Sequence, residues 1–145
     1  MYDHVLLPTD GSEAAMDAEN EAFEITTTND ATLHVLFVVD ETAGPLNVRG
    51  GDERFEEAEA EGEKTVAEIG ERATQAGVGD VTEVVRQGTP HEEILEYADE
   101  HCDLVVMGTR GRSGLDRQLL GSVTEKVVRR SNPSVLTVRV GSEGT

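Results

Sequence analysis

The sequence is poor in cysteine, aromatic residues and lysine, and it contains no long apolar run. Cys102 is the only cysteine, which excludes an internal disulfide and suits a reducing compartment. It precedes a predicted strand with no base placed to activate it, so we interpret it as a small buried hydrophobe. No run of about 18 apolar residues exists, and nothing near Tyr2 resembles a signal peptide. We therefore expect a cytoplasmic protein that does not enter membranes.

Bases are scarce relative to acids. Thirty aspartates and glutamates face twelve lysines and arginines, which gives a formal net charge of −18. Such a chain would repel nucleic acid and anionic membranes, so neither is an expected partner. The acids alternate with apolar residues along helical patterns, which excludes a disordered acidic tail. A dense carboxylate surface with little lysine indicates adaptation to a high-salt (halophilic) cytoplasm, where screening reduces self-repulsion.

Strand and helix patterns alternate along the chain, which predicts one α/β domain over residues 1–145 with a parallel sheet covered on both faces. The least apolar and most alternating of the strands, 81–86, is expected near an edge. The ordered core should span 4–140, with a loop at 41–52 and a tail at 141–145. The expected strands are 4–8, 33–39, 81–86, 103–107 and 135–140. The expected helices are 55–76, 90–101, 122–131 and a first helix that starts after Ser12 and ends within 26–30.

Three helices carry recognisable signals. Ser12 can cap the first, which should end within the threonine-rich run 26–30. Thr89 and Glu92 form a capping-box pattern around Pro90, a residue favoured at the first helical position. The 55–76 helix shows an apolar stripe at spacings of three and four residues. Its members are Phe55, Ala58, Gly62, Val66, Ile69, Ala73 and Ala76.

A glycine-rich segment carries the strongest chemical signal. Gly108-Thr-Arg-Gly111 follows a buried strand, and Gly121-Ser122 opens a helix nine residues later. Glycines let backbone N–H groups converge on an anion, and the start of a helix adds unpaired N–H groups and a positive dipole end. Ser122 can offer its hydroxyl to a phosphate, or it can cap the helix in a box with Glu125. Neither a P-loop lysine motif nor a dinucleotide-binding glycine motif is present.

Charge supports an anion site in this segment. Six of the twelve bases lie between Gly108 and Ser131, against only two acids. Two of them, Arg129 and Arg130, suit the carboxyl end of a helix, and the other four suit phosphate binding. These four are Arg110, Arg112, Arg117 and Lys126.

These residues resemble the signature of the universal stress protein family, whose ATP-binding members carry G-x2-G-x9-G-[ST]. The run 108–131 carries that signature, 5–13 is similar to the family's first strand and turn, and 88–94 is similar to its third helix start. The resemblance covers nearly the whole chain. It implies a Rossmann-like fold, similar to the adenine nucleotide alpha hydrolases, with sheet order 3-2-1-4-5. It also implies a homodimer formed through the fifth strand, Val135 to Val140.

The resemblance further implies an ATP site, with Mg or Mn, at the crevice between the first and fourth strands. The turn at Pro8, Thr9 and Asp10 would line the adenosine, with Asp10 near the ribose or a metal, although a plain turn residue is the alternative reading. Val38 would contact the adenine, and Met107 and Gly108 would approach the nucleotide. The phosphate-binding residues would be Arg110, Gly111, Arg112, Gly121, Ser122, Val123 and Thr124.

Three functions are compatible with these residues. The first is an ATP-binding regulatory module of a stress response that signals to a protein partner. The second is a slow ATPase or phosphotransferase, for which no residue reads as a water-positioning group. The third is a dimeric scaffold without nucleotide, although this chain keeps the glycines. His91 is interpreted as a polar residue of a helix start. His4, His34 and His101 are dispersed without metal-ligand spacing.

Overall fold

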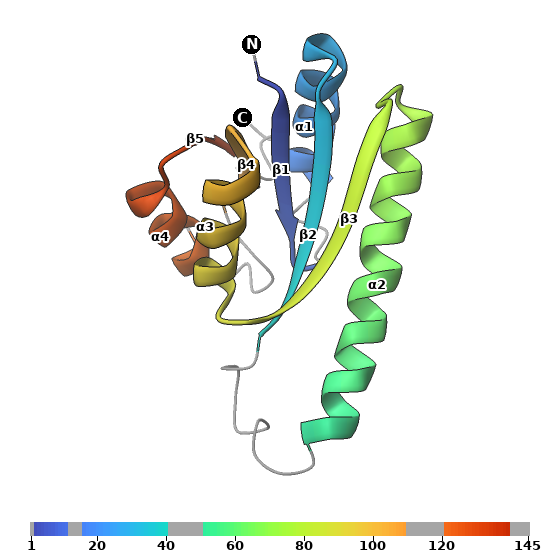
Figure 1. The fold of residues 1–145 in the computed structure, drawn as a ribbon, viewed down its shortest axis with the longest axis vertical. Coiled ribbons are helices and arrows are strands. Elements are labelled where there is room, and N and C mark those ends of the chain that lie inside the picture. Colours follow the sequence, from blue (N-terminus) through green and yellow to red (C-terminus); the bar gives the residue numbers. More distant parts are fainter. Residues whose placement is uncertain (1, 12–15, 41–50, 110–120, 140–145) are drawn as a thin grey trace.

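The computed structural model describes residues 2–11, 16–40, 51–109 and 121–139, with side chains described from Phe55 onward in the third range. Five parallel strands form one sheet in the order β3-β2-β1-β4-β5 (Figure 1). The α/β class, the parallel sheet and the strand order expected from the family resemblance are confirmed. The strands are β1 (His4–Thr9), β2 (Thr32–Asp40), β3 (Asp80–Gly88), β4 (Leu104–Gly108) and β5 (Ser134–Val138).

The middle of the sheet is its most buried part. Val5, Leu6 and Leu7 of β1 have no exposed surface, because β1 pairs with β2 on one side and β4 on the other. Continuous apolar runs are what a strand covered on both faces requires. β3 lies at an edge and has several exposed residues, as its alternating sequence predicted.

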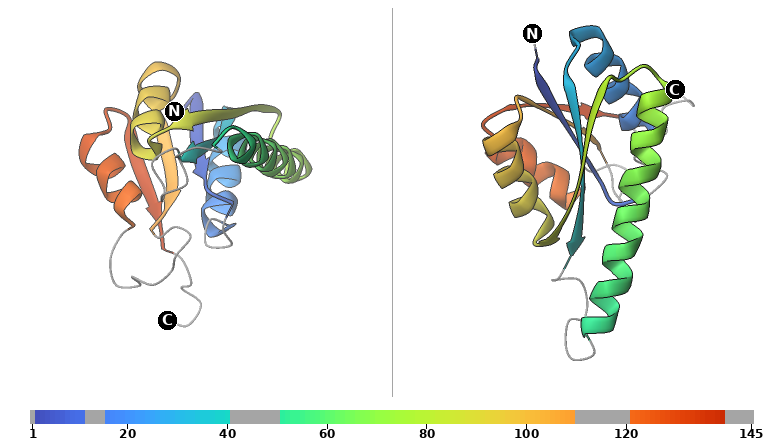
Figure 2. Two further views of the ribbon diagram at one scale, coloured as in Figure 1. Left: turned by 90° about the horizontal axis from the view of Figure 1, so that it is seen from below. Right: turned by 45° about the vertical axis from the view of Figure 1, so that its right-hand side comes forward.

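Helices cover both faces of the sheet, two on each (Figure 2). α1 (Met16–Asn29) and α2 (Gly51–Gln75) bury Phe23 and Ile69 against one face. α3 (Pro90–His101) and α4 (Ser122–Arg130) bury Ile94 and Val127 against the other. Among the described residues, no helix is long and apolar enough to cross a lipid bilayer.

α2 follows its predicted apolar stripe but not its predicted limits. It begins at Gly51, so the last two residues of the expected 41–52 loop are helical, while 41–50 lie outside the described residues. It ends at Gln75, which leaves Ala76 exposed rather than in the stripe. Gly77 adopts a positive φ of 105°, and the Val78 N–H bonds the Ala73 carbonyl at 3.0 Å. This pattern is a Schellman motif, which stops a helix at a residue able to adopt the left-handed conformation.

α1 ends at Asn29, within the threonine-rich run 26–30 where the sequence predicted its end. The Thr26 and Thr27 hydroxyls donate to the carbonyls of Ala22 and Phe23, at 2.6 and 3.0 Å, so these threonines are satisfied inside a helix. The chain leaves the helix at Asp30, which has a φ of 56°. Ser12, the expected cap, lies outside the described residues.

The remaining boundaries need smaller corrections. Pro90 is the first residue of α3 as predicted, but Thr89 makes no side-chain capping bond, so the expected capping box is absent. In extended backbone at the N-cap, Thr89 contributes only its carbonyl, which accepts from the Glu93 N–H at 3.0 Å. β5 ends at Val138 rather than at Val140, which is outside the described residues.

Candidate functional site

The candidate site lies where β1 and β4 end side by side. Because all five strands are parallel, their carboxyl ends share one edge of the sheet, the lower edge in Figure 1. The chain continues from β1 to α1 on one face, whereas α4, which follows β4, packs on the other. Such a divergence of connections marks the crevice where open α/β sheets bind ligands. Thr9 and Gly108, the last residues of the two strands, stand at this point.

A tight turn closes the end of β1. The Thr9 hydroxyl accepts a 3.0 Å hydrogen bond from the Gly11 N–H, and Gly11 has a φ of 80°. A positive φ suits glycine, since a side chain would be strained there. Pro8 is buried behind the turn, and Asp10 is half-buried at its tip. The turn therefore presents Thr9 and Asp10 at the carboxyl edge.

Backbone N–H groups of α4 gather at the same edge. Gly121 is the N-cap, and the first helical hydrogen bond runs from the Glu125 N–H to the Gly121 carbonyl at 2.9 Å. The amides of Ser122, Val123 and Thr124 consequently have no acceptor within the helix, as in the first turn of any α-helix. Three convergent N–H groups and the positive end of the helix dipole form a setting for an anion.

Ser122 is not the cap of this helix. It occupies the first helical position and is exposed, and Gly121, without a side chain, takes the cap position. A capping box of Ser122 with Glu125, one of the two readings that the sequence left open, therefore does not form, because Glu125 is the fourth helical residue after Gly121 and a capping box needs the third. The Ser122 hydroxyl is therefore exposed at the first helical position and is not used to cap the helix.

Two hydrogen bonds hold the start of α4 to the end of β4, and a third joins that end to β5. Thr124 is buried, and its hydroxyl donates to the Gly108 carbonyl at 3.0 Å. The Gly121 N–H donates to the Thr109 carbonyl at 2.7 Å, and the Thr109 N–H donates to the Val138 carbonyl at 3.0 Å. The Thr124 side chain therefore faces the protein, and its backbone N–H is the group that it offers at the start of α4.

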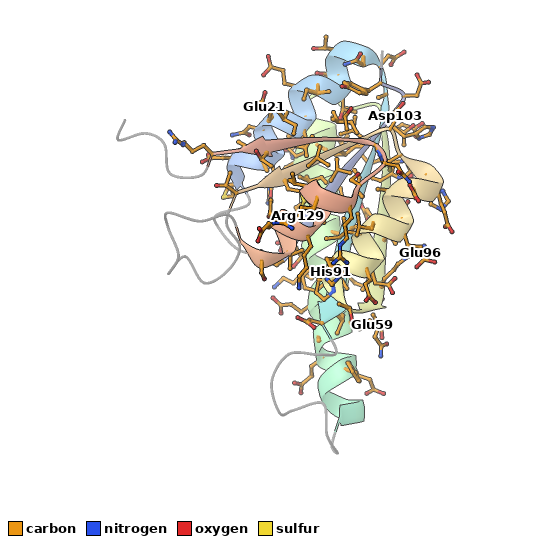
Figure 3. The ribbon with its side chains drawn as sticks, turned by 90° about the vertical axis from the view of Figure 1, so that its left-hand side faces the viewer. Glu21, Glu59, His91, Glu96, Asp103 and Arg129 are labelled. Atoms are coloured by element: carbon orange, nitrogen blue, oxygen red, sulfur yellow. The ribbon has the colours of Figure 1, made fainter. Side chains whose placement is uncertain are left out.

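The other candidate residues fall into three groups. Val38 and Val123 are half-buried and pack against the α3 and α4 side of the core, which also holds buried Met107. The predicted ligands Arg110, Gly111 and Arg112 lie outside the described residues, as does Arg117. On α4, Lys126 and Arg130 are exposed, and Arg129, labelled in Figure 3, pairs with Glu125 at 3.4 Å on the surface.

The described residues offer few ligands for a metal ion. Within the described ranges, no three histidine, cysteine, aspartate or glutamate side chains are grouped to hold a metal ion. Asp10 is the single acid of the predicted set at the crevice. One carboxylate fits Mg²⁺ only where phosphates supply further oxygen ligands, which is the usual arrangement for this ion with nucleotides.

Sequence reasoning missed a cluster at the opposite edge of the sheet. His4 and His101, interpreted with His34 as dispersed, come together with Tyr97 around the His34 ring. Two spacings signalled it: alternation puts His4 with Leu6 and His34 with Leu36 on one sheet face, and Tyr97 and His101 lie four residues apart on a helix. The sequence could not show that α3 crosses this part of the sheet.

Comparison with known proteins identifies the family. The model of the universal stress protein family matches residues 1–139. Universal stress protein MJ0531 of Methanocaldococcus jannaschii is 36% identical over 142 residues, covering 96% of this chain and 83% of that protein. The solved structure of MJ0577 from the same organism matches with a TM-score of 0.87 and 33% identity over 99% of both chains. A universal stress protein crystallised in complex with cAMP matches with a TM-score of 0.72 and 31% identity, covering 97% of this chain and 98% of the other. A family model over this much of the chain, supported by relatives above 30% identity, shows that the protein belongs to the universal stress protein family.

Proposed function

We propose that this protein is an ATP-binding regulatory module, which holds the nucleotide at the carboxyl edge between β1 and β4. The observation that carries the proposal is that the turn after β1 and the start of α4 lie at the same edge of the sheet. The Thr9–Gly11 turn ends β1, and the first turn of α4 is fixed to the end of β4 through Thr124 and Gly108. The two sides of this crevice have complementary chemistry for a nucleotide.

The phosphate side is the start of α4. The N–H groups of Ser122, Val123 and Thr124 lack intrahelical acceptors, and the exposed Ser122 hydroxyl lies beside them. The loop that precedes this helix supplies Arg110 and Arg112 by sequence. A cluster of bases next to a helix start, in a chain of net charge −18, favours a ligand with several negative charges.

The adenosine side is the end of β1 and β2. Thr9 and Asp10 are placed to hydrogen-bond a ribose, and half-buried Val38 offers an apolar contact to a base. Asp10, with phosphate oxygens, would complete a Mg²⁺ or Mn²⁺ site. The relative crystallised with cAMP supports an adenine nucleotide as the ligand class. When bound, ATP and its metal would supply a charged surface that a protein partner can read.

The test is to purify the protein in molar KCl, denature it and identify any released nucleotide by chromatography. Binding of added ATP and of cAMP is then measured by calorimetry on nucleotide-free protein. We expect ATP to be released or bound by the wild type, and to be lost from a variant with Gly121→Val and Ser122→Ala. The substitution at the N-cap adds bulk where the phosphate approaches, and the second removes the hydroxyl.

A matched control is Gly79→Val. A Cβ at Gly79 meets nothing within 4 Å, so this variant adds the same side chain without touching the crevice. We expect it to retain ATP. Absence of nucleotide from the wild type, together with no rise in melting temperature on adding ATP, would overturn the proposal. Tighter binding of cAMP than of ATP would instead correct the ligand within the same site.

Hydrolysis separates the module from a slow ATPase. Phosphoryl transfer needs a group that positions the nucleophile, and no described residue at the crevice other than Asp10 is a candidate. We therefore expect ATP to be recovered intact after hours of incubation with Mg²⁺, with ADP formation close to that of the Gly121→Val, Ser122→Ala variant. ADP production well above that variant would establish the enzyme instead.

Self-association belongs to the same proposal. β5 lies at the edge of the sheet next to β4, and its described residues are half-buried except Ser134. A second copy pairing at this edge would make a homodimer and cover Val135 to Val138. Light scattering in molar KCl is expected to give twice the mass of 15.6 kDa, and a monomer at all concentrations would contradict this part.

A further inference from the structure

The amino-terminal edge of the sheet holds a cluster of aromatic and imidazole rings that the nucleotide proposal does not use. His4 begins β1, His34 lies near the start of β2, and Tyr97 and His101 belong to the last turns of α3. Ring centroids of His4 and His34 are 5.2 Å apart, and those of Tyr97 and His101 are 4.6 Å apart. His34 is buried in the middle, with 7% of its surface exposed.

Two hydrogen bonds join these rings into a chain. Nδ1 of His4 lies 3.0 Å from Nε2 of His34, and Nδ1 of His34 lies 2.6 Å from the Tyr97 hydroxyl. His34 of β2 therefore joins β1 to α3 through hydrogen bonds, in addition to the apolar packing of α3 on the sheet. Both of its ring nitrogens are engaged, one with β1 and one with the helix.

The protonation states of His4 and His34 determine whether the hydrogen bond between their rings can form. A hydrogen bond between two ring nitrogens needs one N–H and one lone pair. With both imidazoles neutral, or with one proton added on exposed His4, a lone pair remains on one of the two facing nitrogens. When both rings are cationic, two N–H groups face each other at 3.0 Å, so the bond is lost and two like charges repel.

The surroundings also oppose a charge on His34. Its pKa is lowered from 6.5 to about 4, chiefly by burial and then by His4 and His101, while Asp80 of β3 acts in the opposite direction. Arg86, also of β3, places its guanidinium 5.0 Å from the centre of the Tyr97 ring and pairs with Glu93 at 3.4 Å. Asp103 accepts hydrogen bonds from the backbone N–H of His4 and adds a carboxylate at the same edge.

We propose that His4, His34 and Tyr97 form a proton-sensitive latch between the sheet and α3, which is closed while at most one of the two imidazoles is cationic and opens when both are. Opening moves His4 outward and releases the carboxyl-terminal turns of α3 from β2. The latch lies at the edge opposite the candidate nucleotide site, so its test needs no nucleotide and is independent of the proposed function.

The first measurement follows the two imidazoles and the helix together. In molar KCl, ¹⁵N spectra of the histidine side chains report each protonation step, while amide exchange reports the protection of α3. We expect protection of the amides from Ala98 to Cys102 to fall by up to about tenfold per pH unit once the second imidazole is protonated. Exchange rates are corrected for the intrinsic effect of pH, and far-UV circular dichroism confirms that the fold persists.

Two variants and a control assign the effect. His34→Gln removes the buried imidazole, and His4→Gln replaces its partner by an amide oxygen that can accept from a protonated His34. Both should remove the acid-induced loss of α3 protection or move it to lower pH, and the second keeps the test sound should the first not fold. His91→Gln changes a histidine in the first turn of α3, at the opposite end of the helix from Asp103 (Figure 3). It should leave the acid-induced loss of α3 protection unchanged.

A second readout comes from tyrosine fluorescence. The chain has two tyrosines and no tryptophan, so in a Tyr2→Phe background Tyr97 is the sole emitter. Its emission should change with the second protonation step and not with the first. The proposal is overturned if the amide protection of α3 is unchanged when both His4 and His34 are cationic. It is also overturned if both glutamine variants lose that protection at the same pH as the wild type.

Discussion

Thr124 and Gly108 join α4 to the end of β4: the threonine hydroxyl donates to the glycine carbonyl at 3.0 Å. Thr124→Val keeps the shape but leaves the half-buried Gly108 carbonyl without this donor, which should lower the unfolding free energy by about 1 kcal/mol. We also expect weaker ATP binding, because the amides at the start of α4 lose their fixed position. Urea unfolding and calorimetry measure the two effects.

Thr124→Ser is the matched rescue for this position. It restores the hydroxyl and should recover most of the ATP affinity, even where the lost methyl leaves stability reduced. Unchanged affinity in Thr124→Val, with stability alone lowered, would show that this hydrogen bond serves only the fold.

Glu19 and Arg72 form a two-pronged ion pair between α1 and α2, with distances of 3.1 and 2.9 Å. Glu19 is almost fully buried, whereas 44% of the Arg72 side chain is exposed. Glu19→Gln should lower the unfolding free energy by about 1–2 kcal/mol, less than for a fully buried pair, because solvent screens the arginine. Arg129→Gln, which breaks the surface pair with Glu125, should cost under about 0.5 kcal/mol in the same urea experiment. Equal costs would show that burial of Glu19 is irrelevant.

His34 should make stability depend on pH in a defined direction. Its pKa is about 4 in the fold against 6.5 for a free imidazole, so the unfolded chain binds the proton more readily. The unfolding free energy therefore falls as the pH is lowered from about 6.5 towards 4, and the contribution of His34 is fully present above 6.5. In His34→Gln the slope should be shallower by up to about 1 kcal/mol per pH unit in this window. A slope equal to that of wild type would rule out a neutral buried His34.

Cys102 should be an unreactive thiol. Burial, with a smaller effect of Asp103, raises the pKa of its thiol to about 12. Since only the thiolate reacts, alkylation by iodoacetamide at pH 8 should be slower than that of free cysteine by more than about a hundredfold. Protein unfolded in urea supplies the comparison and should react at the free rate. Rapid alkylation of the folded protein would show that Cys102 is accessible.

Salt should stabilise the fold. Glu57 and Glu61 are exposed one helical turn apart on α2, and similar acids follow along the same helix. Like charges at this spacing cost about 0.2–0.5 kcal/mol per pair, and screening at 1 M salt acts within about 3 Å. The melting temperature should rise between 0.1 and 2 M KCl, and less steeply in a variant with Glu57→Gln and Glu61→Gln. A flat response would remove the argument for a high-salt environment.

The periodic patterns gave most of the fold. The apolar runs of β1 and β2 and the stripe of α2 can be read directly from the spacing of residues. Why the stripe contains a glycine at position 62 is explained only by the structure. A Cβ there would lie 2.7 Å from Cδ1 of Phe37, so the helix approaches β2 where glycine leaves room. Helix starts were less predictable, since α2 begins at Gly51, ahead of the Phe55 expected, and Gly121 rather than Ser122 is the N-cap of α4.

The candidate site was predictable as a segment but not in the direction of its side chains. Glycine spacing after a strand indicated the start of α4, whereas the inward position of Thr124 depends on packing between elements 16 residues apart. The contact of His34 with Tyr97 spans 63 residues and depends on where α3 crosses the sheet. No local pattern contains that information.

The central place of β1 also shapes how the chain is made. β1, β2 and β3 are neighbours in the sheet and consecutive in sequence, so this half can assemble on the ribosome as soon as β3 has emerged. β1 then presents a bare row of N–H and C=O groups until β4 arrives beside it. During synthesis the nascent chain is thus most exposed to wrong pairing along the strand that is the best protected in the finished protein.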